Sequence, residues 1–134
     1  MNDEYKSMHV LIVDDFEMIR ATIRLALEKL EIPRIEEAEN GEQALVKLHS
    51  LIAAGERIDL IFCDWNMPKM SGIQLLEACK KDPKLSSIPF IMVTSESDKA
   101  QVLEAIRLGA ADYIAKPFAV ETIEKKLQRI KKKA

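Results

Sequence analysis

Five polar residues of this 134-residue chain are not scattered through the sequence. Each of them lies at the end of a short apolar stretch. They are Asp14, Asp15, Asp64, Thr94 and Lys116. Three carboxylates gathered in one pocket repel one another and raise one another's pKa unless a cation joins them. Mg²⁺ meets this need, because it takes oxygen ligands and prefers one or two carboxylates together with a phosphate oxygen. The residue types therefore predict a divalent-metal site.

The same five residues are also suited to phosphoryl transfer. An aspartate carboxylate can attack phosphorus and form an acyl phosphate. The transfer otherwise needs alignment and positive charge on the equatorial oxygens. A metal ion and the ammonium group of Lys116 would supply that charge, and the hydroxyl of Thr94 could donate a hydrogen bond to a third oxygen.

Each of these residues, taken alone, has a more ordinary explanation. Asp14 or Asp15 could cap a following helix, and Thr94 could do the same further along the chain. Lys116 could be a solvated surface lysine. The functional interpretation depends on all five lying at the same place in the fold.

The elements that would place them alternate strictly along the chain. Apolar runs of strand length occupy residues 8–13, 58–63, 88–93 and 111–115, and residues 34–38 are a short, less apolar strand candidate. Segments with apolar residues at helical spacing occupy residues 16–30, 42–54, 73–81, 99–108 and 120–130. Breaks between them are marked by Pro33, Asn40-Gly41, Pro83 and Gly109.

Five strand–helix units in this order predict an α/β fold, a doubly wound (βα)5 domain with a five-stranded parallel sheet. Right-handed crossovers bring the carboxyl ends of parallel strands to one edge, where ligands bind in such sheets. The five polar residues are therefore expected to converge there. No linker, repeat or low-complexity segment interrupts the pattern, so we expect one domain over residues 1–134.

Composition argues against several other classes of protein. The chain has 20 basic and 22 acidic residues, which gives no basic field for nucleic acid. No apolar stretch approaches the roughly 20 residues needed to span a bilayer. Cys63 and Cys79 have no metal-ligand spacing and fall in apolar patterns, which favours free thiols in a reducing compartment. We therefore expect a cytoplasmic protein that binds neither membrane nor nucleic acid.

The sequence around these residues resembles the response-regulator receiver domains, and among them the regulators of chemotaxis. The resemblance covers nearly the whole chain and is carried by Val13-Asp14-Asp15-Phe16, Asp64-Trp65-Asn66-Met67-Pro68, Met92-Val93-Thr94-Ser95, Gly109-Ala110-Ala111-Asp112-Tyr113 and Lys116-Pro117-Phe118. It implies a flavodoxin-like sheet with strand order 2-1-3-4-5. It also implies a cis peptide bond between Lys116 and Pro117.

The resemblance also implies a role for each residue. Asp64 would be the phosphoacceptor, and Asp15, Asp64 and the backbone carbonyl of Asn66 would bind Mg²⁺ directly, with Asp14 acting through water. The phosphoryl oxygens would be held by Thr94 and Lys116.

Residues around this set would control the signal. Tyr113 would be the aromatic switch that turns inward as Thr94 moves, and Asn66 and Glu96 would tune hydrolysis of the acyl phosphate. The output face would include Lys99, Val102, Tyr113 and Lys126. Ser71 stands where the family often has Asp, and Asp98 stands where the chemotaxis proteins tend to be basic.

The expected function is that of a self-phosphorylating and self-dephosphorylating signalling switch, not a metabolic enzyme. It would accept phosphate from a sensor histidine kinase and, as a monomer without an attached output domain, bind a target such as the flagellar motor switch. A phosphatase could act on it as well. A phosphate sink or shuttle, or a phosphorylation-independent interaction module, remain alternatives.

Two other classes fit less well. A haloacid-dehalogenase-type phosphatase needs Asp-x-Asp after its first strand, whereas Asp64 is followed by Trp65 and Asn66. A flavin or dinucleotide site needs a glycine- or hydroxyl-rich loop after the first strand, and Asp14-Asp15 would repel its phosphate.

Overall fold

The computed structural model describes residues 5–95 and 99–133. They form five strands and five helices in strict alternation. The strands are β1 (His9–Val13), β2 (Arg34–Ala38), β3 (Leu60–Asp64), β4 (Phe90–Ser95) and β5 (Asp112–Lys116). The helices are α1 (Glu17–Lys29), α2 (Gly41–Ala53), α3 (Gly72–Lys81), α4 (Lys99–Arg107) and α5 (Val120–Lys133).

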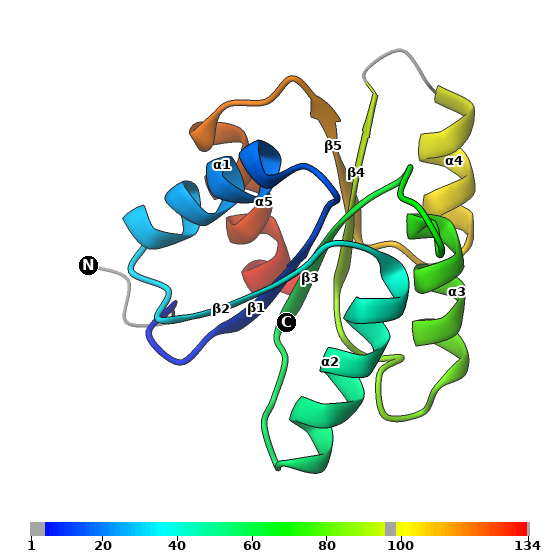
Figure 1. Ribbon diagram of the computed structural model, residues 1–134. Coiled ribbons are helices and arrows are strands. Elements are labelled where there is room, and N and C mark those ends of the chain that lie inside the picture. Colours follow the sequence, from blue (N-terminus) through cyan, green and yellow to red (C-terminus); the bar gives the residue numbers. More distant parts are fainter. Residues whose placement is uncertain (1–4, 96–98, 134) are drawn as a thin grey trace.

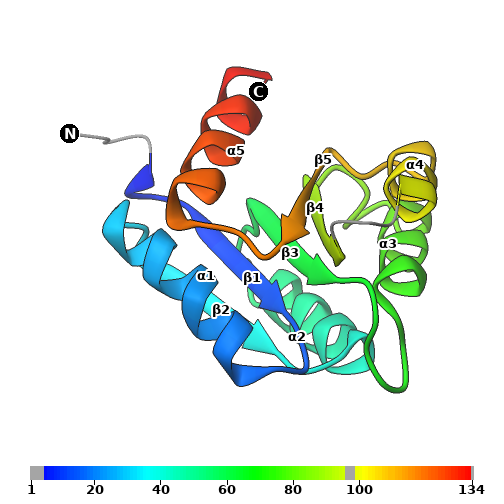
Figure 2. The ribbon, with the colours of Figure 1, turned by 90° about the horizontal axis from the view of Figure 1, so that it is seen from above.

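All strand pairs are parallel, and the strand order is β2-β1-β3-β4-β5. The predicted doubly wound α/β fold and its strand order are therefore confirmed. Figure 1 shows α1 and α5 on one side of the sheet and α2, α3 and α4 on the other, and Figure 2 shows the same three layers from above. The Lys116–Pro117 peptide bond is cis, as the resemblance implied.

Alternate residues of the central strands supply two separate cores. In β3, Leu60 and Phe62 pack toward α1 and α5, whereas Ile61 and Cys63 pack toward α2, α3 and α4. All four are fully buried, which explains why the strand reads as one continuous apolar run. Cys63 and Cys79 are both free, buried thiols, in agreement with the sequence.

The helix ends follow local sequence signals. Ser71 and Gln74 form a capping box at the start of α3, so the replacement of the family's usual Asp by Ser preserves the cap. Asn40 caps α2 by accepting the amide hydrogen of Gln43. Gly109, with φ of 110°, follows the end of α4, where a left-handed residue closes a helix. No helix within the described ranges is both long and apolar enough to cross a membrane.

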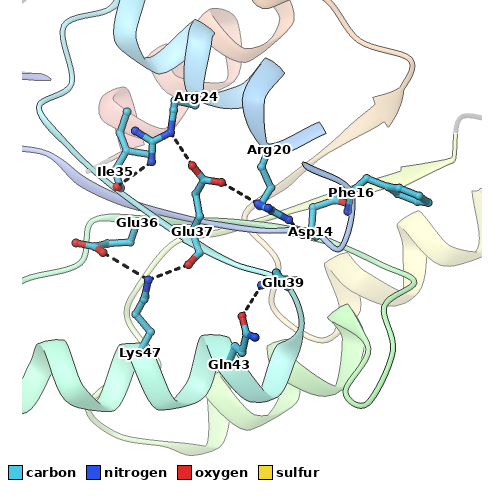
Figure 3. A network of polar contacts seen from close by, with 10 residues as sticks. All are labelled: Asp14, Phe16, Arg20, Arg24, Ile35, Glu36, Glu37, Glu39, Gln43 and Lys47. Carbon is cyan, nitrogen blue, oxygen red and sulfur yellow. Dashed lines mark hydrogen bonds and ion pairs between the residues drawn. The ribbon is translucent and has the colours of Figure 1, made fainter. Parts of the chain in front are cut away.

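The outer edge of the sheet at β2 is covered by side chains. The Ala38 carbonyl accepts the Asp14 amide hydrogen from the β1 side, so the carbonyls of Ile35 and Glu37 point outward by alternation. Arg24 donates to the Ile35 carbonyl at 3.2 Å, and Lys47 donates to the Glu37 carbonyl at 2.9 Å. Figure 3 shows both contacts.

Candidate functional site

The carboxyl ends of β1 and β3 bring the predicted acidic residues together, and the end of β5 adds Lys116. Asp14 directly follows β1, and Asp64 is the last residue of β3. One carboxylate oxygen from each of Asp14, Asp15 and Asp64 lies within 4.8 Å of the other two. Lys116, the last residue of β5, reaches into the same pocket. Its Nζ lies 2.9 Å from Asp64 Oδ1 and 3.5 Å from Asp14 Oδ2.

Backbone hydrogen bonds hold the two acidic segments in place. Asp14 extends the β1–β2 ladder by one bond to Ala38, and its Oδ1 accepts the Phe16 amide hydrogen at 2.9 Å. Beyond β3, the Trp65 amide donates to the Val93 carbonyl, and the Gly72 amide donates to the Trp65 carbonyl at 2.8 Å. The chain therefore turns back on itself immediately after Asp64.

Two oxygens of this cluster are buried without a hydrogen bond, namely Asp14 Oδ2, which has only the 3.5 Å ion pair with Lys116, and Asp15 Oδ1. A buried carboxylate oxygen without a hydrogen bond is costly, and a hard cation with oxygen preference would satisfy it. The donor set and its unsatisfied oxygens thus fit Mg²⁺. Asn66 lies exposed two residues beyond Asp64.

Burial and mutual repulsion raise the pKa of Asp14 and of Asp64. Desolvation raises the pKa of Asp14 to about 6, against an ordinary value of 3.8, and the nearby charge of Asp64 adds to the rise. Desolvation likewise raises the pKa of Asp64, although the Lys116 ammonium opposes it. Burial acts to lower the pKa of Lys116, but the hydrogen bond and charge of Asp64 outweigh it and raise the pKa. Lys116 therefore stays charged.

Thr94 lies near the carboxyl end of β4 and is almost fully buried. Its hydroxyl donates a hydrogen bond to Gln101 Oε1 of α4 at 2.8 Å. Sequence reasoning did not single out Gln101, and no spacing signal marks it, because a glutamine in the first turns of a helix is an ordinary surface residue.

Comparisons with known proteins agree with this geometry. The family model described as response regulator receiver domain matches residues 10–128. This chain belongs to the response-regulator receiver family. It is 39% identical over 123 residues to the chemotaxis protein CheY of Pseudomonas aeruginosa, covering 92% of this chain and 95% of that protein. It is 38% identical over 125 residues to CheY-3 of Vibrio cholerae, covering 93% and 92%.

A solved structure shows the same likeness in three dimensions. The chemotaxis response regulator CheY4 of Vibrio cholerae superposes with a TM-score of 0.79 at 33% identity, over 92% of this chain and 98% of that one. A CheY-like receiver domain is a signalling switch.

The receiver residues predicted for the output face lie on α4, β5 and α5. Lys99 is exposed and Val102 is half-buried on α4. Tyr113 on β5 is 36% exposed, and Lys126 Nζ lies 4.8 Å from the centre of its ring. Lys126 also donates to Asp112 Oδ1 at 3.0 Å, so it is held in place beside the tyrosine. Glu96 and Asp98 lie outside the described residues.

The raised pKa of Asp14 leads to a prediction about the stability of the metal-free receiver. The folded pKa of about 6 exceeds the ordinary value of 3.8, so the folded form binds the proton more tightly. The resulting stabilisation is complete below the lower value and is lost as the pH rises through the higher one. At pH 7.5 in EDTA, we expect Asp14→Asn to raise the free energy of unfolding by roughly 1–3 kcal/mol.

Urea unfolding followed by Trp65 fluorescence at pH 7.5 and pH 4 measures this difference. The gain should be present at pH 7.5 and nearly absent at pH 4, and saturating Mg²⁺ should favour the wild-type protein instead. A variant less stable than wild type at pH 7.5, or a gain in stability that is equal at both pH values, would contradict the raised pKa of Asp14 in the folded protein.

Proposed function

We propose that this receiver domain, as one unit over residues 1–134, accepts a phosphoryl group from a sensor histidine kinase onto Asp64 and thereby changes its binding to a partner protein. The observation that carries the proposal is the pocket itself. A buried carboxylate bonded to Lys116 lies beside two acids with unsatisfied oxygens. That combination has little structural use without a metal ion and a further anion.

The roles follow from the chemistry of each group. The Asp64 carboxylate attacks phosphorus, the bond from phosphorus to the donor nitrogen breaks, and an acyl phosphate forms on Asp64. Asp14, Asp15, Asp64 and the Asn66 carbonyl would hold Mg²⁺, which supplies positive charge to the phosphoryl oxygens when bound. Lys116 keeps a charged ammonium beside Asp64 and would pair with another of those oxygens.

Hydrolysis would reset the switch. Water attacks the phosphorus, and the Asp64 carboxylate is regenerated as inorganic phosphate leaves. We place Asn66 and Glu96 in the role of tuning this rate, and a separate phosphatase could accelerate it.

Thr94 supports a route from the phosphate to the surface. Its hydroxyl is bonded to Gln101 of α4 in the present state. Donation to a phosphoryl oxygen would require this bond to be given up, which would release a contact between β4 and α4. Tyr113 would then turn inward from its half-exposed position and alter the face formed with Lys99, Val102 and Lys126.

The pathway is proposed from the relatives. CheY of Pseudomonas aeruginosa and CheY-3 of Vibrio cholerae are named chemotaxis proteins. We therefore propose a role in chemotaxis, in the cytoplasm, with the flagellar motor switch as the target of the phosphorylated monomer.

Trp65 gives a direct test, because it is the single tryptophan of the chain and directly follows Asp64. Titration with Mg²⁺ should change its fluorescence, and acetyl phosphate should then produce a further change that requires Mg²⁺. Asp82→Asn serves as a control that alters a carboxylate at the end of α3. No response of the folded wild-type protein to either ligand would favour a phosphorylation-independent interaction module instead.

A further inference from the structure

Arg20, in the first turns of α1, links the acidic loop, which consists of Asp14 and Asp15, to the edge strand β2 (Figure 3). Its Nη1 donates to the backbone carbonyl of Asp14 at 2.7 Å. Its Nε donates to Glu37 Oε1 at 2.8 Å. The arginine side chain is only 13% exposed, so these contacts are shielded from water.

The backbone of Arg20 and the Glu37 carboxylate that binds its guanidinium are both held in place by further hydrogen bonds. The Arg20 amide donates to the Phe16 carbonyl in the first turn of α1, which ties its backbone to the end of the acidic loop. Glu37 also accepts from Arg24 Nε at 2.7 Å, so its carboxylate is fixed between two arginines. Burial acts to raise the pKa of Glu37, but the hydrogen bonds from both arginines outweigh it and lower the pKa. The Glu37 carboxylate that binds Arg20 therefore stays charged.

The carbonyl that Arg20 holds lies in the peptide unit between Asp14 and Asp15. A peptide unit is planar, so fixing its oxygen also fixes the direction of the Asp15 nitrogen and Cα. Asp14 Oδ1 is already fixed by the Phe16 amide. Asp15 Oδ1, in contrast, is buried and accepts no hydrogen bond. Since no hydrogen bond orients this oxygen, its position relies on the Asp15 backbone, and Arg20 holds the peptide unit that leads into that backbone.

We propose that Arg20 is a positioning residue for the metal site, which it serves by holding the Asp14 carbonyl so that Asp15 presents its carboxylate to the cation. Glu37 supports it by holding the guanidinium. This inference rests on the proposed function, since it concerns the Mg²⁺ site of the same pocket. When a residue that orients a metal ligand without touching the metal is removed, the metal affinity commonly falls by about 10–100-fold.

A purely electrostatic effect of Arg20 would have the opposite sign. A cation near three carboxylates repels Mg²⁺, so removing its charge alone would strengthen metal binding. A purely structural role would lower the free energy of unfolding without changing the affinity of the folded protein for the metal. Of these three roles, only the positioning role predicts that the variant still folds but binds Mg²⁺ more weakly.

Arg24 provides a matched control. Arg20→Gln and Arg24→Gln each remove one positive charge from α1 and one hydrogen bond to Glu37. Only Arg20 also contacts the Asp14 carbonyl, whereas Arg24 contacts the Ile35 carbonyl at the sheet edge. The comparison therefore isolates the contact with the metal-binding loop.

The experiment is a titration of the wild-type chain of 134 residues and of both variants with Mg²⁺ alone, monitored by Trp65 fluorescence, with circular dichroism to verify folding. We expect about tenfold weaker Mg²⁺ binding in Arg20→Gln, and unchanged or slightly tighter binding in Arg24→Gln. Equal affinities for the two variants, or tighter binding in Arg20→Gln, would overturn the proposal. If Arg20→Gln fails to fold, Arg20→Met and Arg24→Met, which keep an apolar stem, carry the same expectations.

The wild-type titration separates this inference from the proposed function. If the wild-type protein binds no Mg²⁺, the metal site itself is contradicted and the positioning role falls with it. If the wild type binds Mg²⁺ and the Arg20 variants bind it equally well, only the positioning role is contradicted.

Discussion

Replacement of Asp64 by asparagine is expected to abolish Mg²⁺-dependent phosphorylation by acetyl phosphate while leaving the fold intact. An amide of the same size cannot act as the nucleophile that forms an acyl phosphate. The substitution also removes a buried charge whose pKa is raised by desolvation, so the folded state is not expected to lose stability. Intact-protein mass spectrometry should show one added phosphoryl group on the wild type and none on the variant.

The control for this prediction is Asp82→Asn. Asp82 is also partly buried, caps the Lys84 amide and lies beside His49, but it is at the end of α3. Its variant should be phosphorylated as efficiently as the wild type. If Asp64→Asn is still phosphorylated in a Mg²⁺-dependent reaction, the phosphoacceptor is another residue. Circular dichroism verifies that the variant is folded.

The largest expected loss of stability comes from Gly72→Ala. A Cβ atom at this position would overlap the backbone carbonyl of Asp64 and would lie 3.0 Å from the Cα of Trp65. The Gly72 amide is bonded to the Trp65 carbonyl, so the two segments cannot separate without breaking that bond. Because the obstacle is backbone, we expect the free energy of unfolding to fall by roughly 3 kcal/mol or more.

Gly55→Ala is the matched comparison. Gly55 has φ of 83° and no atom within 4 Å of a built Cβ, so an alanine there is strained only by its backbone conformation. Its cost should be about 1 kcal/mol. Urea unfolding of both variants measures the difference. A Gly72→Ala protein as stable as Gly55→Ala would show that the loop after Asp64 can move away from the strand.

The sequence pattern located every strand and both ends of β2, but it misplaced at least one end of each of the other four strands, for a physical reason. The runs predicted strands from residues 8, 58 and 88, whereas the ladders begin at His9, Leu60 and Phe90. Met8, Ile58 and Ile88 are nevertheless buried. Hydrophobicity reports burial of a side chain and not pairing of its backbone, so it extends past the first ladder hydrogen bond.

The opposite error occurs at the carboxyl ends. The strands were predicted to stop before Asp64, Thr94 and Lys116, yet all three residues belong to β3, β4 and β5. Asp64 and Lys116 are polar because they meet in the pocket, and Thr94 is polar where it bonds to Gln101 of α4, so none of the three marks the end of its strand. Being part of the ladder gives these side chains a more rigid base than a loop would provide.

The convergence of Asp14, Asp15, Asp64 and Lys116 followed from sequence, because the carboxyl ends of parallel strands meet at one edge. The contacts of Arg20 and Gln101 did not. Each lies on an amphipathic helix among other polar residues, where the sequence pattern is satisfied by exposure to solvent. Which polar side chain folds back onto the sheet depends on tertiary distances, such as the 2.7 Å from Arg20 to the Asp14 carbonyl.

The covering of β2 by Arg24 and Lys47 has a consequence for behaviour at high concentration. A strand with free outward carbonyls is a template onto which another polypeptide can add, and such additions seed aggregates. Here the carbonyls of Ile35 and Glu37 are already engaged by cationic side chains. A second chain would have to displace both before it could form a ladder, so this edge resists sheet extension and favours a protein that remains dispersed.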